Sequence, residues 1–298
     1  MHLICLGTLR KGLGTGCLAN PLTGRESRFD LKPADTPRKI VVVGGGPAGL
    51  KAAAVAASRG HQVSLFEEKD HMGGQLTLAA RAPHKEGFQD VVRHLELMAR
   101  RSGVAIHMSS HIDRDDLMAG KPDAVILATG GIPLTALFPG LESVPWAMAG
   151  DIMEGKIPLE AESLLVIGGG LVGLEAADFI SAREKKVVLV EMLQEVGVKL
   201  DPLPRVMLLK RLRAKGVEIH TATHVAKIEP GKVELEKEGE IFEVPAEMVV
   251  LAVGVRANRD LVEELEGSGL EIHTVGDALE PRGAGEAILE GLEAGAAV

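Results

Sequence analysis

Residues 40–49 read Ile-Val-Val-Val-Gly-Gly-Gly-Pro-Ala-Gly, an apolar, β-branched run that passes directly into three glycines and then a fourth. An alanine-rich segment follows, and residues 63–66, Val-Ser-Leu-Phe, form a second apolar run. This order predicts a strand, a tight turn, a helix and a strand, which together make the βαβ unit of a parallel sheet.

The same unit occurs twice in the chain. Residues 40–67 align without a gap on residues 164–191 at an offset of 124, and the glycines and the final glutamate of each copy coincide. Self-similarity of this kind indicates one supersecondary unit used twice. We therefore expect the α/β class, with two doubly wound, Rossmann-like dinucleotide-binding domains.

Boundary signals place these domains along the chain. Residues 1–36 are rich in Gly and charge and contain Asn20, Pro21 and Pro33, which predicts a loop-dominated N-terminal tail. Residues 227–249 alternate around Gly231 and Gly239, which predicts a β-meander that closes the second domain. We predict a discontinuous first domain at 37–158 and 249–298, with the second domain inserted at 159–248.

Composition excludes several classes of function. The chain has 33 basic and 42 acidic residues and only six Phe, one Trp and no Tyr, which argues against nucleic acid as a partner. Every apolar run is interrupted well before the roughly 18 residues that a membrane span requires, and the N-terminus lacks the features of a secretory signal. Two cysteines make no disulfide framework, which favours a reducing cytoplasm.

The first glycine motif has the residue types that bind a pyrophosphate. Gly44 allows the tight turn, Gly46 lets backbone amides approach the phosphates, and Gly49 permits close packing of the helix on the strand. The N-terminus of that helix brings partial positive charge to the phosphates. Glu67 ends the next strand, where its carboxylate can accept hydrogen bonds from ribose hydroxyls. The alternative is a glycine turn in an unrelated α/β fold.

The second motif repeats these features and favours NADH over NADPH. Glu191 can accept a hydrogen bond from the adenosine 2'-hydroxyl of NADH and would repel the 2'-phosphate of NADPH. No arginine lies between Glu191 and Arg205 to neutralise that charge, but Lys185 and Lys186 precede the strand and Lys199 follows it, which leaves the alternative open. The residues predicted to bind this nucleotide are Gly168, Gly170, Leu171, Val172, Gly173 and Glu191.

Four shorter motifs accompany the glycine motifs: Gly73-Gly74-Gln75-Leu76, Ala128-Thr129-Gly130, Ala252-Val253-Gly254 with Asn258, and Val275-Gly276-Asp277-Ala278. With them, nearly the whole chain resembles the C-terminal FAD- and NAD(P)-binding portion of the 2,4-dienoyl-CoA reductase and trimethylamine dehydrogenase family, the old yellow enzyme-like NADH:flavin oxidoreductases. The resemblance implies FAD in the first domain and NAD(P)H in the second.

The resemblance also implies roles for particular residues. Asp277 is expected to position the ribityl-phosphate region of FAD, and the segment of Glu286, Ala287 and Ile288 is expected at a helix start near the flavin ring. The predicted FAD-binding residues are Gly44, Gly46, Pro47, Ala48, Gly49, Glu67, Gly74, Gln75, Leu76, Ala128, Thr129, Gly130, Gly276, Asp277 and Ala287. Gly254 is also predicted to bind a cofactor.

Two features of the family are incomplete in these 298 residues. Cys5 and Cys17 resemble the last two of four cysteine ligands of an iron-sulfur cluster, and the positions of the other two ligands fall at Met1 and before it. We expect two unligated thiols, with no complete cluster from this chain alone. The FMN-containing barrel that precedes this region in family members is not in the sequence, so both a stand-alone reductase and the back half of a larger enzyme remain open.

The sequence thus predicts an electron-transfer flavoprotein in which hydride passes from NADH to FAD and electrons leave to a partner protein, an FMN or iron-sulfur domain, or another acceptor. We expect the cofactors to supply the chemistry, and we predict no catalytic side chain and no metal site. The alternative is a structural or regulatory module that holds FAD or ADP without turnover, because fold alone does not establish catalysis.

Overall fold

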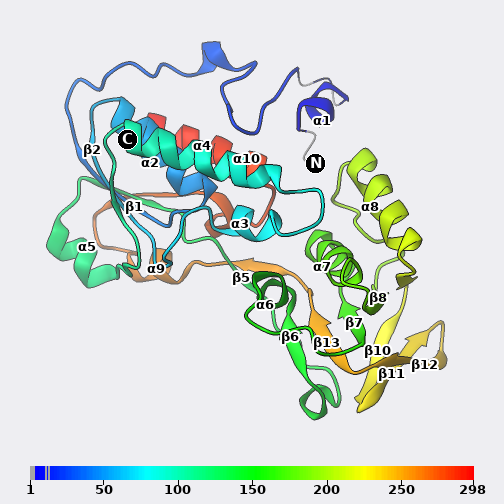
Figure 1. Cartoon of the computed structure of the whole chain (residues 1–298). Coiled ribbons are helices and arrows are strands. Elements are labelled where there is room, and N and C mark those ends of the chain that lie inside the picture. Colours follow the sequence, from blue (N-terminus) through cyan, green and yellow to red (C-terminus); the bar gives the residue numbers. More distant parts are fainter. Residues whose placement is uncertain (1–3, 11, 13) are drawn as a thin grey trace. The chain divides into compact units, whose positions relative to one another are not determined.

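The computed structural model describes residues 4–10, 12 and 14–298 (Figure 1). These residues form two compact units. The inserted unit comprises Leu78–Glu86 and Pro133–Val255, and the outer unit comprises the described residues up to Thr77 with Gly87–Ile132 and Arg256–Val298. The predicted α/β class with one domain inserted in another is confirmed. The predicted domain boundaries remain a prediction, because the compact units divide the chain at other points.

The outer unit contains a parallel sheet of five strands built on the first βαβ unit. β1 (Lys39–Val43), α2 (Pro47–Ser58) and β2 (Gln62–Phe66) lie where the sequence predicts them, and β1 pairs with β2 in parallel. The strand order is β15-β4-β1-β2-β3. The added strands are β3 (Ala105–His107), β4 (Ala124–Leu127) and β15 (Glu271–Thr274).

Both faces of this sheet are buried, which explains why β1 reads as a continuous apolar run. Ile40 and Val42 face a core shared with α2 and its neighbours, whereas Val41 and Val43 face a second core on the opposite side. α4 (Gly87–Arg101) and α10 (Ala284–Ala297) pack along α2 (Figure 1). The shorter helices α5 (Arg114–Gly120) and α9 (Asp260–Glu264) also belong to the outer unit.

α10 approaches α2 closely because it carries glycines at the contact. A Cβ at Gly291 would lie 2.2 Å from the carbonyl oxygen of Ala48, and one at Gly295 would lie 2.5 Å from that of Ala52. Real Cβ atoms do not approach backbone oxygens so closely, so each position excludes a side chain. The C-terminal helix is therefore held against the start of α2, which is where the first glycine motif ends.

The inserted unit repeats the same strand arrangement. Its parallel sheet has the order β6-β13-β7-β8-β9, with β7 and β8 in the places of β1 and β2. Helices α6 (Ala149–Glu154), α7 (Leu171–Ser181) and α8 (Pro202–Ala214) belong to this unit. The strands are β6 (Trp146–Met148), β7 (Ser163–Ile167), β8 (Lys186–Val190), β9 (Glu218–His220) and β13 (Met248–Leu251).

One face of that sheet is covered by the predicted meander. β10 (His224–Glu229), β11 (Gly231–Lys237) and β12 (Glu240–Ala246) form an antiparallel sheet of three strands, which confirms that prediction. Leu165 and Ile167 of β7 share a core with Val233 and Leu235 of β11. Leu164 and Val166 point the other way, into a core shared with α7 and α8. Alternate residues of one strand therefore serve two different layers.

The remaining elements are short. β5 (Gly131–Pro133) and β14 (Val255–Ala257) pair where the chain passes between the units. Within the predicted tail, the described residues include helix α1 (Ile4–Arg10) and a 3-10 turn, η1 (Glu26–Arg28), so this segment is less irregular than its composition predicted. None of the helices in the described part of the chain combines the length and apolar character that a membrane crossing requires. The remaining short elements are the helix α3 (Gln75–Ala79) and the 3-10 turns η2 (Leu141–Ser143) and η3 (Gly276–Ala278).

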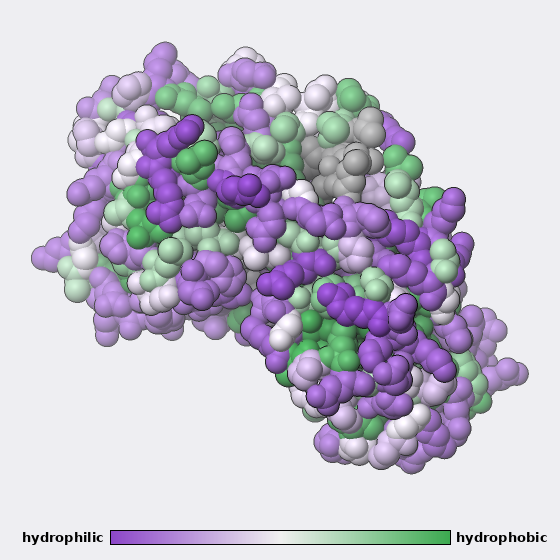
Figure 2. All heavy atoms as spheres, viewed as in Figure 1, coloured by the Kyte–Doolittle hydropathy of each residue, from purple (hydrophilic) through white to green (hydrophobic). Residues whose placement is uncertain are grey.

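The face of the molecule drawn in Figure 2 is mostly hydrophilic, with apolar residues gathered in smaller groups. This matches the excess of charged over aromatic residues in the sequence. Small exposed apolar groups are usual on protein surfaces and do not by themselves mark an interface.

An ion pair at the start of the outer sheet predicts a measurable pH dependence. Arg38 donates to Glu271 Oε2 at 2.6 Å, and this contact, followed by that of His273, lowers the pKa of Glu271 to about 2. Because the pKa is depressed from 4.5, the pair stabilises the fold above pH 4.5 and its contribution is lost as the pH falls toward 2. Since the side chain of Glu271 is 43% exposed, we expect a contribution of about 1 kcal/mol or less.

The substitution Glu271→Gln tests this. Its unfolding midpoint should lie below that of the unmodified chain between pH 7 and pH 5, and the difference should shrink as the pH falls toward 2. Circular dichroism during heating measures it, and exposed Glu264→Gln is the matched control. A difference that does not change with pH would contradict the assignment.

Candidate functional site

The outer glycine motif folds into a turn that two of its glycines make possible. Gly44 has φ +106°, and a Cβ there would lie 2.2 Å from the carbonyl oxygen of Ala128. A Cβ at Gly49 would lie 1.9 Å from the carbonyl oxygen of Gly44. Both positions therefore exclude side chains for reasons internal to the protein: the first because of its backbone conformation and the second because the helix packs tightly on the strand.

Gly46 differs from Gly44 and Gly49 because neither its backbone conformation nor any described residue requires a glycine there. Its φ of −69° and ψ of 179° suit any residue. A Cβ at Gly46 would meet no heavy atom of the described residues within 4 Å. It is the N-cap of α2, and Pro47 and Ala48 open the helix behind it, so backbone N–H groups of the first turn lie at this open space. A space of this kind beside a helix N-terminus fits the pyrophosphate of a dinucleotide.

The carboxylate of Glu67 is anchored beside this turn. Its side chain is buried, and Oε2 accepts a hydrogen bond from the Gly45 N–H at 2.6 Å while Oε1 accepts one from the Lys69 N–H at 2.9 Å. Each carboxylate oxygen can accept a second hydrogen bond. Glu67 is therefore held in one orientation and retains the capacity to accept a ribose hydroxyl.

The Gly73-Gly74-Gln75-Leu76 motif lies against the glycine turn. The Gly73 N–H donates to the carbonyl oxygen of Gly45 at 2.9 Å, and a Cβ at Gly74 would lie 3.1 Å from Gly46 Cα. Gln75 begins α3 with an exposed side chain, whereas Leu76 is buried. The motif thus borders the open space at Gly46.

The Ala128-Thr129-Gly130 segment continues β4 beside the turn. The Ala128 N–H donates to the carbonyl oxygen of Val43 at 2.8 Å, and the Thr129 hydroxyl donates to that of Asn258 at 2.9 Å. Gly130 has φ +77° and accepts a hydrogen bond from the Asn258 N–H. These bonds hold the segment at the point where the chain leaves the outer unit.

The Gly276-Asp277 turn comes from the far end of the chain to the same place. A Cβ at Gly276 would lie 3.0 Å from the Cβ of Ala48 and 3.7 Å from that of Ala287. The turn therefore lies between the start of α2 and the start of α10. Asp277 Oδ1 accepts a hydrogen bond from the Arg282 N–H at 3.2 Å, and burial raises the pKa of Asp277.

The inserted unit carries a second turn with the same geometry. Gly168 has φ +109°, with a Cβ position 2.4 Å from the carbonyl oxygen of Ala252, and a Cβ at Gly173 would lie 1.8 Å from the carbonyl oxygen of Gly168. Gly170, at φ −70°, again faces space in which a Cβ would meet no described atom within 4 Å. Glu191 accepts hydrogen bonds from the Gly169 N–H at 2.7 Å and from the Leu193 N–H at 2.9 Å.

The remaining residues predicted at the second site lie around this turn. Leu171 and Val172 open α7 and are partly exposed. Gly254, at φ +124°, accepts a hydrogen bond from the Leu134 N–H at 2.9 Å. Ala252 and Gly254 correspond to Ala128 and Gly130 at the same offset of 124, so the repeat includes this strand end as well.

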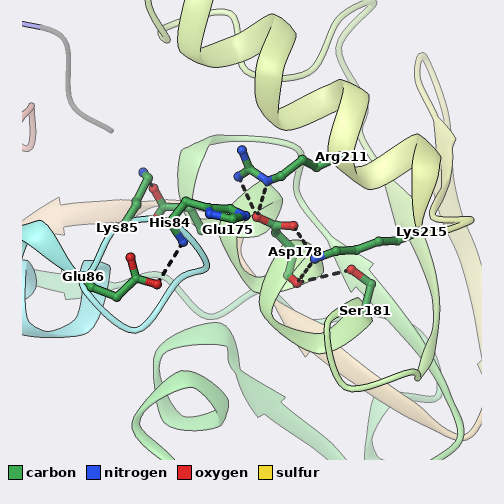
Figure 3. Close-up of polar contacts among 8 residues, drawn as sticks. All are labelled: His84, Lys85, Glu86, Glu175, Asp178, Ser181, Arg211 and Lys215. Carbon is green, nitrogen blue, oxygen red and sulfur yellow. Dashed lines mark hydrogen bonds and ion pairs between the residues drawn. The ribbon is translucent and has the colours of Figure 1, made fainter.

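Figure 3 shows a group of buried charges that the sequence analysis missed. Asp178 of α7 is 1% exposed and accepts hydrogen bonds from Arg211 at 2.7 Å and Lys215 at 2.8 Å, both from α8 or its end. On the same helix, Glu175 pairs with Lys85, and burial lowers the pKa of Lys85 to about 8. These pairs attach α7, whose N-terminus is the second turn, to α8 and to the segment 78–86.

A signal for this group exists in the repeat. At the offset of 124, Glu175 corresponds to Lys51 and Asp178 corresponds to Ala54 of the outer copy. Acidic residues in only one of two similar, otherwise apolar helices require cationic partners from elsewhere in the chain. The sequence could therefore indicate that partners exist but could not identify them.

Comparison with known proteins identifies the family. The sequence model of the protein family described as pyridine nucleotide-disulphide oxidoreductase matches residues 38–278, which is more than half of the chain. The chain belongs to the pyridine nucleotide-disulphide oxidoreductase family. Members of this family bind FAD and NAD(P)H. The family membership confirms the predicted flavin-dependent NAD(P)H oxidoreductase module.

The chain is similar to larger reductases and oxidases of that family. It is 37% identical to a protein named NADH oxidase from Thermoanaerobacter brockii, covering 91% of this chain and 43% of the relative. It is 31% identical to a metal reductase from Desulforamulus reducens, covering 95% and 47%. A solved 2-naphthoyl-CoA reductase in complex with 2-naphthoyl-CoA superposes with a TM-score of 0.93 at 25% identity, covering 99% and 45%.

These comparisons confirm the resemblance to the old yellow enzyme-like family. The chain spans less than half the length of each of these three proteins. Cys5 and Cys17 are both free and exposed. Among the described residues, no three His, Cys, Asp or Glu side chains lie together as a metal site would require.

Proposed function

We propose that the chain is an NADH-dependent flavin oxidoreductase module in which the outer unit binds FAD and the inserted unit binds NADH. The observation that carries the proposal is the open space at the middle glycine of each turn, at Gly46 and at Gly170. Each space adjoins a helix N-terminus and an anchored glutamate. A pyrophosphate and its adenosine ribose require this pair of features.

The proposed roles of the residues are to bind and to orient. Backbone amides at the start of α2 and α7 hold the two pyrophosphates, and Glu67 and Glu191 accept hydrogen bonds from the adenosine riboses. Asp277 holds the ribityl-phosphate part of FAD. FAD, when bound, supplies a two-electron acceptor for the hydride of NADH. Alignment of the cofactors is then the contribution of the protein, and no side chain acts as acid or base.

The preference for NADH rests on Glu191. Both of its oxygens accept backbone hydrogen bonds, so the carboxylate cannot turn away from the turn at low cost when a 2'-phosphate approaches. The described contacts of Lys185 bring it to Glu162 at 2.6 Å. Lys185, one of the three lysines that could accompany a 2'-phosphate, is thereby paired with another carboxylate, which supports NADH over NADPH.

Glu191→Gln tests this preference. The amide retains an acceptor for one backbone N–H but loses the negative charge, so we expect weaker use of NADH and relatively better use of NADPH. The ratio of kcat/KM for the two nucleotides should move toward NADPH by about tenfold, the effect of one hydrogen bond to a charged group. Glu195→Gln, which removes an exposed carboxylate nearby in sequence, is the control. An unchanged ratio would remove Glu191 from the explanation.

The electron acceptor is proposed to be a partner protein or domain that carries FMN or an iron-sulfur cluster. The relatives include proteins named NADH oxidase and metal reductase, and those proteins are more than twice as long as the matched region. Cys5 and Cys17 supply half of a four-cysteine ligand set, so we propose that this chain alone forms no complete cluster. The scarcity of cysteine supports a reducing cytoplasm as the location.

Flavin spectroscopy tests the proposed function. The purified chain, reconstituted with FAD, should show flavin absorbance that anaerobic NADH bleaches. Absence of bound flavin after reconstitution would overturn the oxidoreductase proposal. Bound flavin that NADH fails to reduce would instead support the alternative, a module that holds the nucleotide without turnover.

A further inference from the structure

Glu290 of α10 joins two parts of the segment that precedes its helix. Its Oε2 accepts a hydrogen bond from the Gly276 N–H at 2.7 Å, and its Oε1 pairs with the guanidinium of Arg282. The side chain of Glu290 is 15% exposed and that of Arg282 is 36% exposed, so water and salt screen the ion pair only in part. Glu290 therefore closes the loop that runs from η3 to α10.

Both contacts of Glu290 lead to Asp277. Gly276 is the residue before Asp277, and the backbone N–H of Arg282 donates a hydrogen bond to Asp277 Oδ1. The turn has little room to move toward α2, because a Cβ at Gly276 would already lie 3.0 Å from that of Ala48. Packing and Glu290 thus hold Gly276, the residue before Asp277, and Glu290 also holds Arg282, whose N–H donates to the Asp277 carboxylate.

α10 itself does not need Glu290 for its position. Gly291 and Gly295 pack against the carbonyl oxygens of Ala48 and Ala52, which holds the helix on α2. Both carboxylate oxygens of Glu290 contact the loop that precedes α10, so we infer that Glu290 holds this loop in place and is not needed to hold the helix. We propose that Glu290 is a positioning residue for FAD, which acts by holding Asp277 toward the ribityl-phosphate part of the cofactor. This inference rests on the proposed function of the outer unit.

ADP provides the discriminating probe. It contains the adenosine and pyrophosphate of FAD but lacks the ribityl chain and the flavin ring. ADP keeps both phosphates of FAD, so a residue that acts through Asp277 on the ribityl chain should matter much more for FAD than for ADP. For Glu290→Ala we expect the Kd of FAD to rise about tenfold or more, as for one lost hydrogen bond to a charged group, and the Kd of ADP to change by less than about twofold.

Two further variants make the test specific. Glu290→Gln keeps an acceptor for the Gly276 N–H and loses the ion pair, so it should restore part of the FAD affinity. Glu293→Ala removes an exposed carboxylate from the same helix and should leave both affinities unchanged. Isothermal titration calorimetry with FAD and with ADP measures all of these values on the full chain.

A double-mutant cycle tests the route through Asp277. In an Asp277→Ala background, Glu290→Ala should weaken FAD binding no further, because the two residues act as one unit. Additive losses, or an equal loss of FAD and ADP affinity in Glu290→Ala, would overturn the inference while leaving the proposed function intact. If the unmodified chain binds ADP but not FAD, the proposed function itself fails.

Discussion

Substitution of Gly46 by alanine is expected to remove FAD from a chain that still folds. The backbone conformation at Gly46 suits alanine, and its Cβ would meet no described atom within 4 Å. The methyl group would instead occupy the space proposed for the pyrophosphate and hold it away from the amides of α2. Loss of one hydrogen bond to a charged group, about 1.5–3 kcal/mol, corresponds to about 10- to 150-fold weaker FAD binding.

The measurement is flavin absorbance after reconstitution, together with the unfolding midpoint of the apoprotein. Gly87→Ala is the matched control, because a Cβ at Gly87 also meets no described atom within 4 Å and no cofactor is proposed there. Both variants should unfold at nearly the same temperature. Normal flavin content in Gly46→Ala would contradict the proposed place of the pyrophosphate.

The corresponding change in the inserted unit, Gly170→Ala, is expected to spare the flavin and block its reduction. Gly170 has the same ordinary backbone conformation and the same open surroundings as Gly46. The KM for NADH should rise by about 10- to 150-fold for the same reason as above. Stopped-flow absorbance of anaerobic samples follows the rate of flavin bleaching at increasing NADH.

Gly46→Ala and Gly170→Ala are controls for each other. The first should lose flavin, whereas the second should contain a normal amount of flavin that reacts slowly with NADH. Gly150→Ala adds a control within the inserted unit, because its Cβ would make only an ordinary contact at 3.4 Å. If Gly170→Ala lost flavin as well, the assignment of one nucleotide to each unit would be wrong.

Much of the fold could be predicted from the sequence because the signals are local. β1, α2 and β2 follow from an apolar run, three glycines and an alanine-rich segment, and the second copy follows from the same pattern. Gly44 and Gly168 adopt positive φ, a requirement that glycine alone meets easily and that leaves a trace in the sequence. The family motifs supplied the remaining candidate residues.

Other features could not be predicted because they depend on contacts between distant segments. The buried Asp178 needs Arg211 and Lys215, but nothing in the spacing of these residues indicates the pairing. Lys85 lies in a segment, Leu78–Glu86, that leaves the outer unit and joins the inserted one. Such choices are made by packing and by the need to pair buried charges, and neither leaves a periodic pattern.

The sequence by itself determined that this chain contains two dinucleotide-binding turns, because each turn is encoded by consecutive residues whose conformations are local. Only the tertiary structure decided what surrounds each turn. The carbonyl oxygen of Gly44 leaves no room for a side chain at position 49. The Gly276-Asp277 turn reaches α2 from the other end of the chain, and Glu290 holds this turn through the Gly276 N–H. The physical reason is that close packing and buried hydrogen bonds join residues by their distance in space, which the order of the chain does not specify.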